Sequence, residues 1–489
     1  MSIALLWVAI AFSLVVICRA DWDLLKRGLP SLGLVVSVMY SLTYGLGWTL
    51  WRLDPSSLFG YGTASTRGSL DRLGLLLALG LPTLACSYFF VRAAVGRKPQ
   101  EPFLDLAERH RPRLQRLSFG LVALSVVGLL GMTASGLFLR DPQQQQQALQ
   151  ASWVAKLLIG TGLLSRLAPV GLVLVPFAWT GWSRWQRLAV VLLLSSWTAL
   201  VLGSSSRGQL LAVPLYLFLG SVIWRRLHLR RAVLLLVLGG LLFLPLAEVI
   251  RIQREGDASN PALQRTFEAF QIGKQLMGTS HEFYLMLRAD DCRRDLSAVI
   301  ATDPFALEVY QKGVKSFPSE SVHRWHVVGL YQSCINRFLD ERRWESFDRL
   351  PLALLPRSLG FPSKGLFDGQ FLSESLSASL DLKPGEISYS TISLFADAWW
   401  RWRWPGVALV GVLLGAGLSL IQQLLLGLQR SQPLAGLIGQ LLVLSLVGTW
   451  INNTSLTMIW FLFWDFPKAW FELIVLINLF GFCSSRGAS

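Results

Sequence analysis

Long apolar runs recur along the chain, and they limit what it can fold into. A run of roughly 17 to 25 apolar residues is long enough to cross a bilayer as a helix. Only 15% of the residues are charged, against about 25% in soluble domains. The sequence therefore predicts an all-α, polytopic integral membrane protein with about eleven (10–13) transmembrane helices. The runs fall near residues 2–18, 29–51, 72–91, 117–139, 157–180, 188–204, 209–224, 232–249, 404–427, 434–452 and 455–482.

The two ends of this series need separate interpretation. The first segment, MSIALLWVAIAFSLVVICRADWD, has the length of a signal peptide. It lacks a basic n-region and an A-x-A cleavage site, so we expect a retained helix. The last run contains Asp465 and Pro467. Because proline removes a backbone hydrogen bond, we expect it to kink or divide that run.

Basic residues in the short connections predict the orientation. Residues 92–116 are rich in arginine, and the positive-inside rule places them in the cytoplasm. Counting along the spans puts residues 181–187 and 225–231 on the same side, and both are basic. The net charge of +15 is therefore expected to face anionic lipid, and no nucleic-acid partner is predicted.

The same count of apolar spans divides the chain into three parts. Residues 1–249 are expected to form transmembrane helices one to eight, and residues 404–489 the C-terminal transmembrane helices. Residues 250–403 are too long for a simple connection, so we expect a helical subdomain on the outer surface. Cys292 and Cys334 both fall in it, and an oxidising compartment would allow them to pair.

One cation, Arg207, is expected on the outer side, against the usual charge bias. It stands in SSSRGQLL, between two apolar runs. One interpretation is an arginine that reaches to lipid headgroups. The other is an anion site, since Gly208 allows close backbone approach and a helix N-terminus follows.

Further cations are expected at the same outer side. Arg251 and Arg254 lie three residues apart in EVIRIQREG, so they share a helix face. Arg357 and Lys364 lie in LLPRSLGFPSK, where two prolines stiffen the backbone. Arginine binds phosphate as a bidentate fork and lysine as a point charge. The expected anionic partner is a lipid-linked diphosphate.

At these residues the chain resembles the oligosaccharide repeat unit polymerases, the O-antigen polymerase family. The resemblance rests on SSSRGQLL, on RIQRE at the start of the large loop, on LLPRSLGFPSK, and on ISYSTISLFADAWWRWRWPGVALVGVLLGAGL at the return to the membrane. It implies a metal-independent, cofactor-free glycosyltransferase of the GT-C kind in the bacterial inner membrane. The implied substrates are undecaprenyl-diphosphate-linked oligosaccharides on the periplasmic face. Chain-length regulator and flippase proteins are the other partners it implies.

The implied reaction displaces a diphosphate from an anomeric carbon, so negative charge develops on the leaving group. We expect Arg207, Arg251 and Arg254 to stabilise this charge, with Arg357 and Lys364 as further clamps. Histidine titrates in the range that suits a general base, so His281 is one candidate. The other candidates are Glu248, Asp397 and Glu374. The tryptophans after Asp397 are expected to anchor a helix at the interface, and stacking on sugar is the alternative.

Two other functions are compatible with part of this pattern. An O-antigen ligase-like transferase would use the same donor and another acceptor. A polysaccharide transporter or flippase would place charge within its helices and show paired repeats. The apolar runs hold few charges, Arg166 and Asp465 among them, and no repeat is evident. These features favour the polymerase.

Overall fold

The computed structural model describes residues 2–46, 48–49, 67–96, 102–134, 167–203, 207–224, 394–451 and 466–482. Throughout these ranges the regular structure is helical, and no strand occurs in them. The all-α fold class is therefore confirmed for the part of the chain that the structure describes. The expected span at 232–249 and the amphipathic helices expected in the large loop lie outside it.

Four helical segments are long and apolar enough to cross a membrane: Ile3–Ala20, Gly74–Val95, Arg111–Ala134 and Trp402–Ser431. They belong to α1 (Ile3–Ala20), α5 (Arg67–Val95), α7 (Arg111–Ala134) and α21 (Leu394–Ser431). Their lengths match those that span a hydrocarbon core. The chain is thus a helical membrane protein.

Shorter helices complete the described structure. They are α2 (Trp22–Lys26), α3 (Leu32–Tyr40), the π-helical η1 (Ser41–Leu46), α6 (Phe103–Arg109), α10 (Ala168–Ala178), the 3-10 turn η5 (Trp179–Gly181), α11 (Arg184–Gly203), α12 (Arg207–Ile223), α22 (Pro433–Ile451) and α24 (Phe466–Phe482). Pro467 is the second described residue of α24. The residues before Phe466 lie outside the described ranges, so the expected kink or division at this proline stays a prediction.

The exposed faces of the long helices are as apolar as the buried ones. On α1 the exposed residues include Val8 and Val15, which are 64% and 65% exposed, while Leu6 and Ile10 are buried. On α21, Leu424 is 65% exposed although Gln422 is completely buried. A soluble helix shows the opposite pattern. Hydrocarbon outside and polar side chains inside are what a bilayer environment favours.

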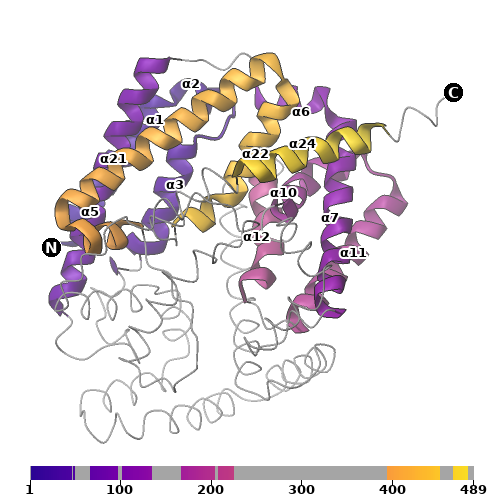
Figure 1. The fold of residues 1–489 in the computed structure, drawn as a ribbon, viewed down its shortest axis with the longest axis horizontal. Helices are drawn as coiled ribbons and strands as arrows, with labels where there is room; N and C mark the ends of the chain where they lie inside the picture. Colours follow the sequence, from indigo (N-terminus) through magenta and orange to yellow (C-terminus); the bar gives the residue numbers. More distant parts are fainter. Residues whose placement is uncertain are drawn as a thin grey trace, which may run out of the picture. The chain divides into compact units, whose positions relative to one another are not determined.

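The described helices belong to two compact units (Figure 1). The first unit contains α1, α2, α3, η1, α5 and α21, together with the last residues of α22. The second contains α6, α7, α10, η5, α11 and α12, with most of α22 and α24.

In the first unit, glycines let α21 approach α5 closely. A Cβ at Gly411 would lie 2.1 Å from Oγ1 of Thr83, and one at Gly415 would lie 2.2 Å from the carbonyl oxygen of Leu84. These glycines form a G-x-x-x-G pair, the spacing that brings two helix backbones together in membranes. Ser87 adds a hydrogen bond by donating from Oγ to the Val412 carbonyl at 2.7 Å. This contact holds the two helices of the unit side by side (Figure 1).

We expect Gly415→Ala to destabilise the protein by about 1–3 kcal/mol, because the methyl group would meet the backbone of α5. Gly417→Ala is the matched control on the same helix, since a Cβ there would have no atom within 4 Å. The control should be neutral or stabilising, because alanine favours a helix over glycine by about 1 kcal/mol. Thermal unfolding of both variants in detergent measures the difference. Equal midpoints would contradict the close packing.

The second unit contains a bundle of α7, α10, α11 and α12. Its apolar core includes Val122, Leu172 and Val190, all fully buried. Close approach again requires glycine, since a Cβ at Gly220 would lie 2.3 Å from the Val173 carbonyl oxygen. Tyr216 Oη donates to the Ser445 carbonyl at 2.9 Å, which joins α22 to α12.

Candidate functional site

Two of the predicted site residues lie within described helices. Arg207 is the first residue of α12, and Asp397 lies in the first turns of α21. Their backbones are described, whereas their side chains are not. The other predicted site residues lie outside the described residues: Glu248, Arg251, Arg254, His281, Arg357 and Lys364, together with Glu374, Cys292 and Cys334. Their convergence on one site stays a prediction.

The position of Arg207 follows from the far end of α12. Trp224, just after this helix, lies against Phe103 and Phe177, with ring centroids 5.0 and 4.5 Å away. Its Nε1 donates to the Val173 carbonyl at 2.8 Å. The C-terminal end of α12 is therefore fixed beside α6 and the C-terminal half of α10. Arg207 begins the same helix about 25 Å away, at about 1.5 Å per residue.

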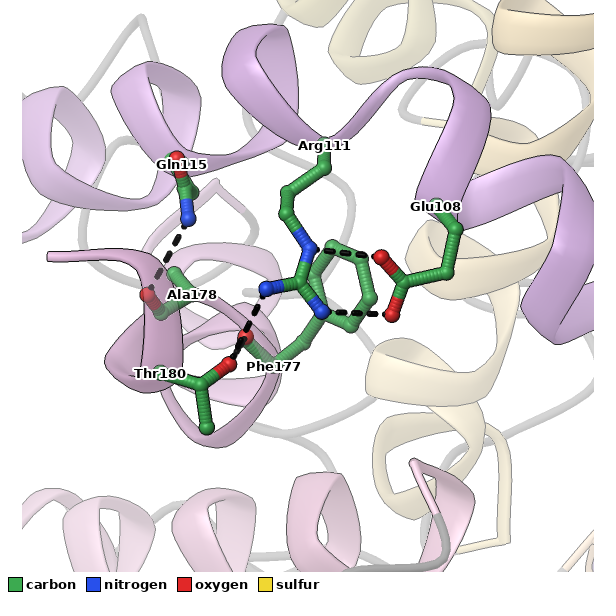
Figure 2. A network of polar contacts seen from close by, with 6 residues as sticks. All are labelled: Glu108, Arg111, Gln115, Phe177, Ala178 and Thr180. Atoms are coloured by element: carbon green, nitrogen blue, oxygen red, sulfur yellow. Dashed lines mark hydrogen bonds and ion pairs between the residues drawn. The ribbon is translucent and has the colours of Figure 1, made fainter.

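A polar network lies at the Trp224 end of the unit (Figure 2). Both oxygens of the Glu108 carboxylate accept from Arg111, from Nε at 2.6 Å and from Nη2 at 2.5 Å. Arg111 also donates from Nη1 to Thr180 Oγ1 at 3.2 Å. The guanidinium lies over the Phe177 ring, 5.1 Å from its centroid. These contacts fasten the start of α7 to the end of α10.

Neighbouring contacts bring the connection between α10 and α11 to the same end of the unit. Gln115 Nε2 donates to the Ala178 carbonyl at 3.4 Å (Figure 2). Arg187, near the start of α11, donates from Nε to the Trp179 carbonyl at 3.0 Å. Residues 103–116, 181–187 and the end of α12 therefore share one end of the second unit. Arg207 lies at the opposite end, beyond the apolar length of the bundle.

The first unit also has a polar end, at a buried ion pair. Arg92 Nε donates to Asp21 Oδ1 at 2.8 Å, and the two side chains are 7% and 0% exposed. Tyr88 Oη donates to the other oxygen, Oδ2, at 2.5 Å. A buried carboxylate is tolerated only when it is paired and hydrogen-bonded. This network therefore fixes the C-terminal end of α1 against the C-terminal end of α5.

The other end of the first unit contains a cation that sequence reasoning missed. Arg403 lies where α21 bends sharply, and its guanidinium lies over the Trp399 ring, 4.6 Å from the centroid. The sequence predicts only that the tryptophans of this stretch anchor a helix at the interface. A four-residue spacing places two residues on one face of an unbroken helix, but here the bend at Trp402 and Arg403 sets the contact, and the sequence gives no signal for that bend geometry.

Comparison with known proteins gives no match to this chain from any family model, curated protein or solved structure. Among the described residues, no group of three or more His, Cys, Asp or Glu side chains is placed to hold a metal ion.

Proposed function

We propose that this protein polymerises undecaprenyl-diphosphate-linked oligosaccharide repeat units into O-antigen or a related exopolysaccharide. It would do so in a bacterial inner membrane, with about eleven spanning helices and its active site facing the periplasm. Three features support the proposal. The chain is a helical membrane protein, its motifs resemble those of the polymerases, and Arg207 stands apart from the basic ends of its own helix bundle.

The position of Arg207 is the observation that carries the proposal. The basic ends of α7 and α11 lie together at one end of the second unit, and Arg207 begins α12 at the other. Positive residues favour the cytoplasmic side. If the shared basic end faces the cytoplasm, Arg207 faces the periplasm. An arginine there needs an anionic partner, and a lipid diphosphate at the membrane surface supplies one.

The proposed reaction forms one glycosidic bond and breaks the bond between an anomeric carbon and a diphosphate oxygen. The hydroxyl oxygen of a single lipid-linked repeat unit attacks the anomeric carbon of the growing chain. The bond from that carbon to the diphosphate oxygen breaks, and undecaprenyl diphosphate leaves with the electron pair. The hydroxyl proton passes to a base, for which the candidates are His281, Glu248, Asp397 and Glu374.

Cations supply the charge stabilisation that the leaving diphosphate needs. Arg207, Arg251 and Arg254 are proposed to stabilise the charge that develops on it, with Arg357 and Lys364 as further clamps. A fixed donor at a developing charge contributes roughly 3–4 kcal/mol to catalysis. The proposal therefore needs several of these side chains within one site.

Deleting the gene in its host tests the proposal. We expect the deletion strain to accumulate single repeat units on undecaprenyl diphosphate at the outer face, because the flippase still delivers them and nothing joins them. Mass spectrometry of extracted lipids, with and without a glycosidase that reaches only the outer face, measures both properties. Single units held on the inner face would indicate a flippase. Full-length polymer left on the lipid carrier would indicate a ligase.

A further inference from the structure

The sharp bend of α21 places an arginine in a conformation that favours glycine. Trp402 has φ −133° and ψ 15°, and Arg403 has φ 58° and ψ −146°. It is the one non-glycine residue with positive φ in the described ranges. The bend folds the residues before Trp402 back on those after Arg403. A Cβ at Gly406 would therefore lie 2.4 Å from the Ala398 carbonyl oxygen. An arginine kept at such a position is a candidate for function.

The Arg403 guanidinium is held over an aromatic ring and is only half-buried. Its Cζ lies 4.6 Å from the centroid of Trp399, whose side chain is only 5% exposed, so the ring is held by its surroundings. Among the described residues, no carboxylate forms an ion pair with Arg403. A guanidinium has five N–H donors, more than contact with one ring can occupy. The contact with Trp399 therefore restrains the side chain and leaves donors for a phosphate.

Contacts inside the first unit give the level of Arg403 along the helices. Gly415 on α21 lies beside Leu84 on α5. Arg403 lies about 18 Å before Gly415 along α21. Arg92, which forms the ion pair with Asp21, lies about 12 Å beyond Leu84 along α5, away from the level of Arg403. The two polar levels are thus about 30 Å apart, which is the thickness of a hydrocarbon core. If Arg92 lies near one surface of the hydrocarbon core, this spacing puts Arg403 near the other, within reach of lipid phosphates.

We propose that Arg403, stacked on Trp399, binds the phosphate group of a membrane lipid. The chemistry fits the phosphodiester of an anionic phospholipid and the diphosphate of a polyprenyl carrier. The inference stands apart from the proposed function, since it requires only a lipid phosphate. Where the lipid is the polyprenyl diphosphate, Arg403 would add a cation to the proposed substrate site.

Arg403→Gly is the informative variant. Glycine adopts φ 58° readily, so this change should keep or raise the unfolding temperature while it removes the guanidinium. Arg403→Lys keeps the charge and loses the planar fork. Arg430→Gln, at the other end of α21, is the control for net charge.

Native mass spectrometry of the full-length protein in detergent measures lipid binding. The probes are phosphatidylglycerol, undecaprenyl diphosphate and, as a lipid without phosphate, diacylglycerol. We expect Arg403→Gly to weaken binding of at least one phosphate lipid about tenfold, the effect of losing a charge-assisted hydrogen bond. Arg403→Lys should be intermediate, and Arg430→Gln and diacylglycerol binding should be unchanged.

The pattern of losses identifies the source of the phosphate. A loss confined to phosphatidylglycerol supports a boundary phospholipid, and a loss confined to undecaprenyl diphosphate supports the polyprenyl carrier. A loss of both supports recognition of phosphate as such. Wild-type affinity for both lipids overturns the inference. It is also overturned if Arg430→Gln has an equal effect, or if Arg403→Gly loses diacylglycerol binding as well.

Discussion

Replacing Arg207 by alanine is expected to abolish polymer while the amount of protein in the membrane stays unchanged. In the proposed reaction, Arg207 stabilises negative charge that develops on the departing diphosphate. Removing one such donor lowers the rate about 100- to 1000-fold. The variant is introduced into the deletion strain, and the ratio of polymer to single repeat units is measured on gels. An immunoblot of the membranes gives the amount of protein.

Arg184→Ala is the matched control for this experiment. Arg184 is the first residue of α11, at the basic end of the same bundle, so its loss should leave polymer length unchanged. Arg207→Lys keeps the charge without the bidentate fork and should retain partial activity. Normal polymer from Arg207→Ala would remove Arg207 from the proposed site.

Replacing Arg92 by leucine is expected to lower the free energy of unfolding by about 3–5 kcal/mol, the effect of leaving a buried charge without its partner. The Asp21 carboxylate would keep the hydrogen bond from Tyr88 Oη and lose its counter-ion. It is completely buried, so water could not replace the guanidinium. Unfolding followed by circular dichroism in detergent measures the change.

The Arg111–Glu108 pair provides the comparison within the same protein. Its side chains are 28% and 48% exposed, so solvent already screens the charges. Arg111→Leu should therefore lower the free energy of unfolding by about 1 kcal/mol or less. Losses of the same small size at Arg92 and Arg111 would show that burial of the Asp21 ion pair has no special role.

The helices of the described structure could be predicted from the sequence because each apolar run carries its own signal. Spans expected at 2–18 and 209–224 correspond to α1 and α12. Side-chain composition determines whether a run can sit in hydrocarbon, and that property is local. The expected ends differ from the observed ends by a few residues, since charged residues continue helices beyond the apolar run, as Arg111 does at the start of α7.

Features that depend on tertiary contact could not be predicted. Asp21 stands among charged residues that look like an ordinary loop, and its partner Arg92 is distant in the sequence. The bend at Trp402 and Arg403 lies at the expected border between the outer subdomain and the span at 404–427, but its non-helical backbone angles leave no mark on the apolar pattern. The π-helical turn Ser41–Leu46 also leaves no mark on the apolar pattern.

Only part of the candidate site could be predicted from the sequence, for the same reason. A helix start at Arg207 follows from the glycine and serines around it. Whether Arg251, Arg357 and Lys364 reach the same point depends on how a long segment folds, which no local pattern encodes. Those residues lie outside the described helices, so their shared site stays a prediction.

The most direct measurement of the central claim uses the purified full-length protein and the lipid-linked glycans that accumulate in the deletion strain. The two are mixed in detergent, and the products are followed by mass spectrometry. We expect a ladder of masses that grows by whole repeat units, with one undecaprenyl diphosphate released at each step. Lipid-linked glycans whose masses stay unchanged, with no undecaprenyl diphosphate released, would contradict the assignment as a polymerase.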